Sequence, residues 1–370
     1  MVSLWKSLKK PVPSAYQLDR LVDSRRLGEA EKSGLHVICD IDKTYLETEF
    51  ENLLRMARIA FEAAADKVTV SGAAEVLLAL RWGDIGRPLP ADGAFPRPLH
   101  FVSSSPPQLR SVLEEKLTMD GLDWTSDTFK NQAYNIRMRR MDLLRQHVAY
   151  KSLAILNLVG AAAPGASFIL VGDNAEFDAF IYAGISLLLS GQLSRDGYRT
   201  YLEIFGVEPH VAHGLLAAMP EVEDRHVAAI LIRNVPGYVY IAEPPLTDGI
   251  RTFDNFYQAA LVLMVDGLLP ASRLWPLTRS FHNHHGLTQR QLAAMLRVVV
   301  DRRPNSPVQA AADDALRRLT ARSGRIEEPP AALVQSLTVD TQALDALSEK
   351  EVLRHARLWM QRKQALTGKK

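Results

Sequence analysis

The 370-residue chain contains a single cysteine, Cys39, so no disulfide can form within the chain. The absence of a disulfide framework fits a reducing compartment. The net charge is only +2, with 44 basic and 42 acidic residues, which argues against the extended basic surface of a bulk nucleic-acid-binding or membrane-binding protein. We therefore expect a cytoplasmic protein with no nucleic-acid partner and, at most, peripheral contact with the inner membrane surface.

Long apolar runs are also scarce. The most apolar region, residues 153–171, is interrupted by Pro164 and Gly165, which predicts a helix, a turn and a strand rather than a membrane span. Residues 1–12 lack the apolar core and small-residue cleavage site of a signal peptide, so we expect none. With 47% apolar and 23% charged residues, the composition is that of a globular protein.

The stretch from residue 35 to residue 48 is the part of the sequence that most clearly indicates chemistry. An apolar run predicts a buried strand, and Asp40, Asp42 and Thr44 follow at its end. Both carboxylates then lie at the edge of the sheet where α/β proteins bind ligands. Two like charges there need a cation or a proton between them, and a hard cation such as Mg²⁺ suits them. The alternative is that both aspartates are turn or helix-cap residues.

Two further polar positions follow the next predicted strand, residues 99–102. Ser103 stands at its end, where its hydroxyl can donate to a phosphoryl oxygen. The alternative is that it only begins a Ser-Pro loop. Lys151 precedes a predicted helix over residues 152–160. It is either a surface lysine or a charge that stabilises a phosphoryl group.

A third predicted strand, residues 167–171, also ends in carboxylates. Gly172 allows a close backbone approach or a sharp turn, and Asp173 follows it at the strand end. A metal held by Asp40 could use Asp173 as another oxygen ligand. Asp178, at the start of the next helix, could be a further ligand, a partner of the ligands or a helix cap.

Strands that alternate with helices predict an α/β fold with a parallel sheet. We expect a helical lead-in over residues 1–34, an α/β domain over 35–270 and a helical C-terminal extension over 271–370. Helical insertions are expected at about 45–98 and 184–225. Periodicity predicts further helices at 17–32, 51–64, 72–81, 108–117, 123–145, 179–190, 253–268, 287–301, 307–323 and 343–365, strands at 227–235 and 238–241, and a linker at 327–334.

Four short motifs resemble, in chain order, the signature motifs of the haloacid dehalogenase (HAD) superfamily: D-x-D-x-T at residues 40–44, Ser103, Lys151 and G-D-x-x-x-x-D at residues 172–178. The resemblance implies a Rossmann-like, three-layer α/β fold and a Mg²⁺-dependent phosphomonoester hydrolase. It implies Asp40 as the nucleophile that forms an aspartyl-phosphate, and Asp42 as the general acid and base. An aspartate at position 42 favours a phosphatase over the ATPase and dehalogenase branches of the superfamily.

The resemblance also implies how the cofactor and the phosphoryl group are held. Mg²⁺ would be bound by the Asp40 carboxylate, the Asp42 backbone carbonyl and Asp173, with Asp178 as a further ligand or a partner of the ligands. The residues implied for the phosphoryl group are Ser103 and Lys151, with Thr44 fixing the loop around it.

A closer resemblance covers residues 35–270. The strings at residues 72–77, 100–109, 168–182 and 230–235 resemble the catalytic domain of the actin-patch-associated phosphatidate phosphatase family. This implies phosphatidate or another lipid phosphate as substrate. Lys43 departs from the usual D-I-D-D-T pattern and either favours an anionic head group or faces solvent. The alternatives are a phosphatase of a soluble phosphometabolite and a catalytically weak scaffold on the same fold.

Overall fold

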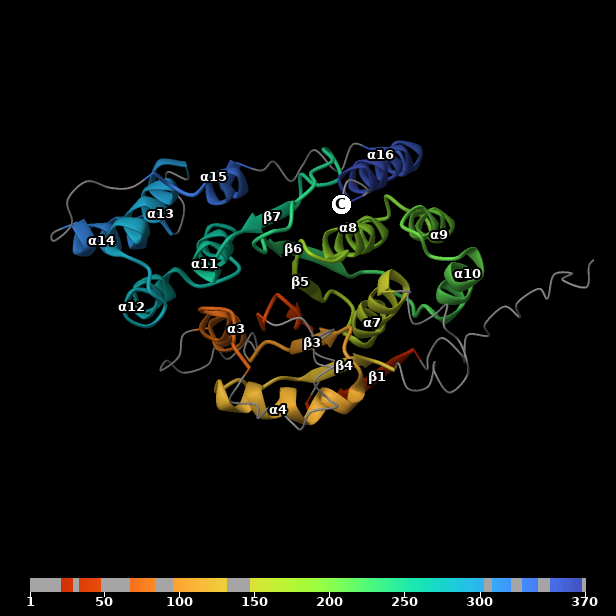
Figure 1. Ribbon diagram of the computed structural model, residues 1–370, viewed down its shortest axis with the longest axis horizontal. Coiled ribbons are helices and arrows are strands. Elements are labelled where there is room, and N and C mark those ends of the chain that lie inside the picture. The colour runs from red at the N-terminus through yellow and green to blue at the C-terminus, as the bar shows by residue number, and fades with distance from the viewer. Residues whose placement is uncertain are drawn as a thin grey trace, which may run out of the picture.

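The computed structural model describes residues 21–28, 33–47, 67–83, 96–131, 147–302, 308–320, 328–338 and 347–367. Within these residues, seven strands form one sheet in the order β1-β4-β3-β2-β5-β6-β7 (Figure 1). The strands are β1 (Val22–Arg26), β2 (Leu35–Asp40), β3 (Leu99–Ser103), β4 (Ser126–Lys130), β5 (Ser167–Asp173), β6 (His226–Arg233) and β7 (Ile250–Phe253). Only the β1–β4 pair is antiparallel among them. The predicted α/β, Rossmann-like fold is confirmed.

The central strand β2 pairs in parallel with β3 on one side and with β5 on the other. Asp40 is in register with Val102, the residue before Ser103, and Cys39 is in register with Val171. Parallel strands end at the same edge of a sheet, so this register brings together the polar residues that follow the three apolar runs.

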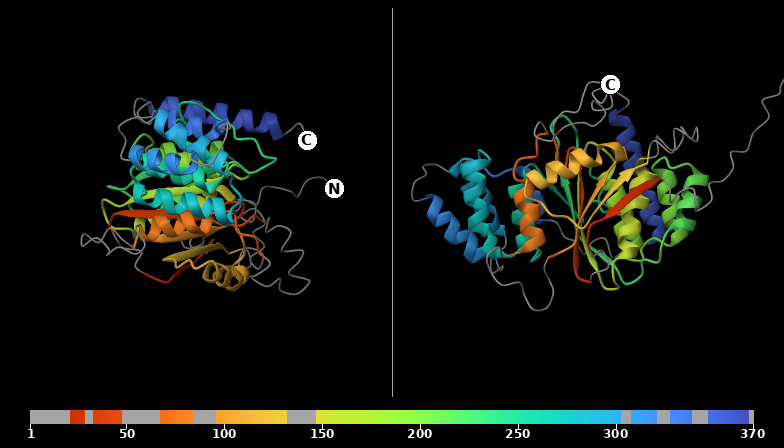
Figure 2. Two further views of the ribbon diagram at one scale, coloured as in Figure 1. Left: turned by 90° about the vertical axis from the view of Figure 1, so that its left-hand side faces the viewer. Right: turned by 90° about the horizontal axis from the view of Figure 1, so that it is seen from below.

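Helices cover both faces of the sheet and give three layers (Figure 2). Successive side chains of β2 point to opposite faces. Val37 and Cys39 therefore belong to one core and Ile38 to the other. The helices over the first core are α3 (Ala73–Trp82), α4 (Arg110–Met119), α11 (Phe256–Val265), α12 (Leu274–His284), α13 (Gln289–Arg302), α14 (Gln309–Thr320) and α15 (Ala331–Thr338). Those over the second are α7 (His147–Ala161), α8 (Asp178–Leu189), α9 (Arg195–Ile204), α10 (Pro209–Ala218) and α16 (Glu349–Thr367).

The C-terminal helices continue the two cores of the sheet. Helices α12 to α15 extend the core beside α3 and α11, and α15 lies next to β7. Helix α16 packs on α8 and α9, where Trp359 is fully buried with its ring 4.0 Å from that of Phe180, centroid to centroid. The boundary at residue 270 remains a prediction. The described helices beyond it bury their apolar sides against the sheet domain.

Two predicted helices contain strands instead. The prediction over residues 17–32 is wrong at β1, a mostly exposed edge strand that carries Asp23 and Arg25. The prediction over residues 123–145 is wrong at β4, which is buried although it is polar. Arg110 forms ion pairs with both strands, because its guanidinium lies 2.8 Å from Asp23 on β1 and 2.6 Å from Asp127 on β4. The edge strand β1 and its inner neighbour β4 both carry charged side chains, so they lack the apolar alternation that a sequence pattern detects.

Of the other predicted helices and strands, most are confirmed and one strand is wrong. The helices expected at 72–81, 108–117, 179–190, 253–268 and 287–301 are confirmed with shifted ends, as is the strand at 227–235. The helices expected at 307–323 and 343–365 are confirmed within the described residues. The strand expected at 238–241 is wrong, because that segment is irregular. The pattern missed β7, α12 and α15, the last of which replaces part of the predicted linker. The helix expected at 51–64 and most of the segment 123–145 lie outside the described residues.

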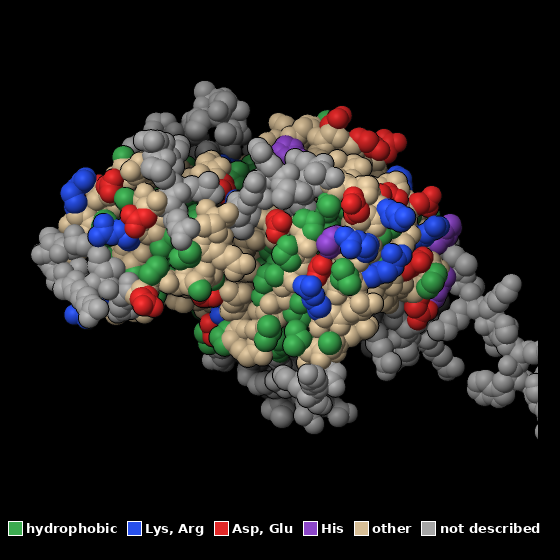
Figure 3. Space-filling model, turned by 90° about the horizontal axis from the view of Figure 1, so that it is seen from above, with side chains coloured by type: hydrophobic (Ala, Val, Ile, Leu, Met, Phe, Trp, Pro, Cys, Tyr) green, Lys and Arg blue, Asp and Glu red, His purple; other side chains and the backbone are tan. Residues whose placement is uncertain are grey.

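Figure 3 shows one face on which acidic, basic and hydrophobic side chains are interspersed, in keeping with the net charge of +2. None of the helices in the described part of the chain combines the length and the hydropathy that crossing a bilayer demands.

Candidate active site

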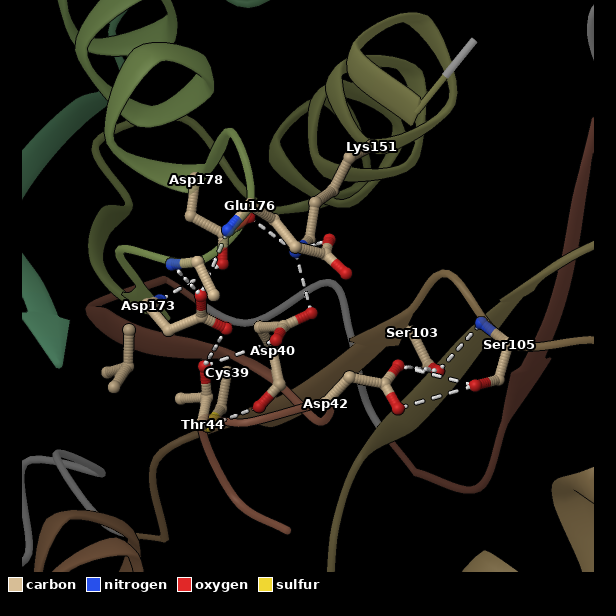
Figure 4. Close-up of polar contacts among 12 residues, drawn as sticks. Cys39, Asp40, Asp42, Thr44, Ser103, Ser105, Lys151, Asp173, Glu176 and Asp178 are labelled. Atoms are coloured by element: carbon tan, nitrogen blue, oxygen red, sulfur yellow. Dashed lines mark hydrogen bonds and ion pairs between the residues drawn. The ribbon is translucent and has the colours of Figure 1, made fainter. Parts of the chain in front are cut away.

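The carboxyl ends of three neighbouring strands present the predicted site residues (Figure 4). Asp40 ends β2, Ser103 ends β3 and Asp173 ends β5. Helices α7 and α8 add Lys151 and Asp178 from one side of the sheet. All five side chains are buried. The structure therefore brings together residues that are up to 138 positions apart in the sequence.

Lys151 is the central cation of this site. Its Nζ lies 2.7 Å from Asp40 Oδ1, donates to Asp178 Oδ1 and lies 3.8 Å from Glu176 Oε2. Helix α7 begins at His147, earlier than expected, so Lys151 points into the interior and is not a surface residue. Burial opposes its charge, but Asp178 and Asp40 raise the pKa of Lys151 well above its usual value. The side chain is therefore a fixed positive charge.

Thr44 connects two of the carboxylates. Its hydroxyl lies 3.1 Å from Asp40 Oδ2 and 3.3 Å from Asp173 Oδ2, so it can donate to either oxygen. The other oxygen of Asp173 accepts hydrogen bonds from the backbone N–H groups of Ala175 (2.6 Å) and Glu176 (3.2 Å). These contacts hold one carboxylate oxygen of Asp173 in its own loop and leave the other directed at the site.

Asp178 is fixed from two sides. Its Oδ1 accepts from Lys151, and its Oδ2 accepts from the backbone N–H of Asp173 at 3.2 Å. The helix-cap alternative for Asp178 is wrong, since Phe177 is the N-cap residue of α8 and no side chain caps the helix. Glycine is required at position 172, where a Cβ would lie 2.3 Å from Asp178 Oδ2 and 2.7 Å from Asp178 Cβ.

We expect Gly172→Ala to destabilise the protein by about 1–3 kcal/mol, because the added methyl group must displace a carboxylate held by two partners. Urea unfolding measures this change. The control is Gly28→Ala, whose Cβ would meet only Thr125 at an ordinary 3.9 Å, and which should unfold like the wild type. Equal stability of both variants would contradict the tight packing at Gly172.

Asp42 faces away from this cluster, toward the end of β3. Ser103 Oγ donates to Asp42 Oδ2 at 3.0 Å, and Ser105 Oγ lies 3.3 Å from the same oxygen. Ser103 Oγ in turn accepts from the backbone N–H of Ser105 at 3.0 Å. Burial raises the pKa of Asp42 to about 7, against the opposing effect of these hydrogen bonds. Ser103, predicted to bind phosphate, thus also holds the predicted acid and base.

A cation fits the other carboxylates. Asp40, Asp173 and Asp178 each offer one oxygen, and the three oxygens lie within 4.8 Å of one another. Burial raises the pKa of Asp40 well above its usual range and that of Asp173 to about 7. When the three carboxylates are ionised, the single charge of Lys151 leaves two negative charges uncompensated. A buried set of oxygen donors with this charge suits one hard divalent cation.

Three residues near the site were not singled out from the sequence. Ser105 was overlooked because it belongs to a Ser-Pro loop, where turn chemistry explains it equally well. Glu176 lies within the second aspartate motif, and its acidic side chain among Asp173 and Asp178 was the available signal. Arg233, at the end of β6, donates to the carbonyl of Lys43 at 2.6 Å, and no local pattern announces this contact.

Lys43 projects toward a neighbouring loop. Its backbone has φ 59°, a left-handed conformation that is uncommon for a residue with a side chain. Its Nζ lies 3.5 Å from the hydroxyl of Tyr238 and 5.0 Å from the centre of that ring. Lys43 therefore contacts the segment after β6 and does not face solvent alone.

Residues 35–194 match the family model of the catalytic domain of phosphatidate phosphatase APP1. This confirms the resemblance inferred from the motifs and supports a phosphatase. The match covers less than half of the 370-residue chain and ends before residue 270, so the rest of the expected resemblance remains a prediction. No curated protein and no solved structure matches the chain.

Proposed function

We propose that this protein hydrolyses phosphate monoesters of the lipid class, such as phosphatidate, by transferring the phosphoryl group to Asp40. One observation carries the proposal. The buried carboxylate of Asp40, at the end of β2, lies 2.7 Å from the buried ammonium of Lys151. Two residues later, Asp42 accepts hydrogen bonds from two serine hydroxyls. This arrangement supplies a nucleophile, a charge that stabilises phosphoryl oxygens, and a separate proton donor.

In the first step, a carboxylate oxygen of Asp40 attacks phosphorus and the bond from phosphorus to the ester oxygen breaks. The protonated carboxyl of Asp42 gives its proton to the departing alkoxide, so an alcohol leaves. Ser103 and Ser105 orient Asp42 for this transfer. Lys151 and Ser103 bind the phosphoryl oxygens, and Thr44 holds the Asp40 side chain.

In the second step, water attacks the phosphorus atom of the aspartyl-phosphate. Asp42, now a carboxylate, accepts the proton of the water, the bond between phosphorus and Asp40 breaks, and inorganic phosphate leaves. Both aspartates return to their starting protonation states, so the cycle balances.

Asp40, Asp173 and the Asp42 carbonyl would hold Mg²⁺, with Asp178 close enough to be a further ligand. When bound, the ion neutralises charge on the phosphoryl group. The residues fit this role because three buried carboxylate oxygens lie within 4.8 Å of one another and carry more negative charge than Lys151 alone compensates.

The lipid class of the substrate rests on the match to the phosphatidate phosphatase domain. A soluble phosphometabolite would use the same phosphoryl chemistry and differs only in its leaving group. The two substrate classes therefore have to be compared directly.

We expect phosphate release from phosphatidate in mixed micelles to exceed release from sugar and nucleotide phosphates at equal concentration. Chelation by EDTA should abolish release, and added Mg²⁺ should restore it, because the carboxylate cluster then regains its counter-ion. A phosphate-release assay over this substrate panel measures both effects. If no ester releases phosphate with Mg²⁺ present, the proposal is wrong and a non-catalytic role on this fold takes its place.

A further inference from the structure

An apolar cavity of about 240 Å³ lies beside residues 174–176, the loop that follows β5. Its walls come from α8, from the irregular segment after β6 and from α16. Its lining includes Phe180, Tyr240, Ile241 and Trp359, and the charged lining residues are Glu176 and Lys363. An apolar cavity beside a phosphoryl-transfer centre has the composition expected of a site for a small apolar group.

The walls of the cavity are tied to one another. Trp359 Nε1 donates to the carbonyl of Ile241 at 2.7 Å, and Arg362 Nη1 donates to the carbonyl of Ala242 at 3.1 Å. The Trp359 ring also packs against Phe180. These contacts join α16 to two segments of the sheet domain. Both α16 and the segment after β6 lie outside the residues matched by the family model.

Two residues that line the cavity contact residues at or beside the catalytic site. Glu176 lines the cavity, and its carboxylate lies 3.8 Å from Lys151 Nζ. Lys43, next to Asp42, contacts Tyr238 at the cavity rim. One end of a bound molecule could therefore lie at the carboxylate cluster while its other end enters the cavity.

A lysine from α16 lies at the same junction. Lys363 Nζ donates to the carbonyl of Glu176 at 2.9 Å and lies 3.6 Å from the centre of the Phe177 ring. The same ammonium lies 4.7 Å from the centre of the Phe180 ring, so a positive charge lies between the aromatic lining and the loop that carries Asp173 and Asp178. This arrangement matches a ligand with an anionic end and an apolar body.

The rim of the cavity is unusually apolar. Six large hydrophobic side chains are exposed in the described part of the chain, and three of them, Tyr238, Val239 and Leu366, line this cavity. Val239 is 69% exposed and Leu366 is 52% exposed. Such clustering at one opening is the pattern of a binding site rather than of scattered surface residues.

We propose that this cavity binds the hydrocarbon chain of a lipid phosphate whose phosphoryl group is placed at Asp40, so that α16 forms part of the substrate site. This rests on the proposed phosphatase function and extends it, because it assigns the recognition of the leaving group to residues beyond the matched catalytic domain. Sugars and nucleosides would leave the apolar lining without complementary contacts.

The test compares methyl phosphate with n-octyl phosphate below its aggregation concentration. The wild type should show kcat/KM for octyl phosphate higher by roughly tenfold or more, because part of the chain leaves water. The double substitution Val239→Asp with Leu366→Asp should remove most of this preference, so that kcat/KM becomes similar for the two esters. Met119→Asp is the matched control, because Met119 is 56% exposed and does not line the cavity. Equal kcat/KM for both esters in the wild type would overturn the proposal.

A binding measurement separates this proposal from the catalytic one. Bromo-octyl phosphonate, which is not hydrolysed, should quench the tryptophan fluorescence of the wild type by contact with Trp359. The Trp359→Phe variant identifies that component of the signal, and the double aspartate variant should lose the quenching. If no ester is hydrolysed but Trp359 is quenched, the catalytic proposal fails and the cavity assignment is supported. If esters are hydrolysed and Trp359 is not quenched, the cavity assignment is overturned alone.

Discussion

Asp40→Asn should lower phosphate release by at least about a thousandfold while the protein stays folded, because the amide is nearly isosteric but cannot act as the nucleophile. The site tolerates the change, since Lys151 keeps Asp178 as a counter-ion. The rate is measured with saturating substrate and Mg²⁺, and folding is measured by urea unfolding.

The matched control for this variant is Asp196→Asn, the same chemical change at a side chain that is 82% exposed. It should leave the rate at the wild-type value. An Asp40→Asn protein that turns over at a comparable rate would exclude Asp40 as the nucleophile. A variant that fails to unfold cooperatively would instead assign Asp40 a structural role.

Lys151→Met should lower the free energy of unfolding by about 3–5 kcal/mol and abolish activity. The lysine is 1% exposed and contacts Asp40 and Asp178, so its removal leaves two buried carboxylates without their counter-ion. Urea unfolding measures the loss. Added Mg²⁺ should recover part of the stability in the variant, because a cation that binds only the folded state stabilises that state.

Lys350→Met removes an exposed lysine on α16 and serves as the control, with an expected change within about 0.5 kcal/mol. If Lys151→Met were as stable as this control, the charge balance inferred for the site would be wrong. If Mg²⁺ stabilised neither the wild type nor the Lys151 variant, the cation site would be wrong.

The central sheet could be predicted because its signals are local. The runs that lead to Asp40, Ser103 and Asp173 are short and apolar, and each one is buried as a parallel strand. The edge strand β1 and its neighbour β4 could not be predicted in this way. β1 and β4 carry charged side chains whose partner, Arg110, lies on α4, so tertiary contacts decide their conformation.

The site, like the sheet, could be predicted only where the signal was local. Residue types and spacing pointed to the three strand-end positions, but not to the burial of Lys151, which depends on where α7 begins. The cavity could not be predicted at all. The segment near Tyr240 gave a false strand signal, and its partner Trp359 lies more than a hundred residues later in the chain.

The transfer of the phosphoryl group to Asp40 can be tested by one experiment. A single turnover with Mg²⁺ and the best substrate is quenched in acid, and the peptide that contains residues 35–48 is examined by mass spectrometry. We predict a phosphoryl group on Asp40 that hydroxylamine removes, as expected of an acyl phosphate. Phosphate release without any phosphopeptide, or a phosphoryl group on another residue, would contradict the account.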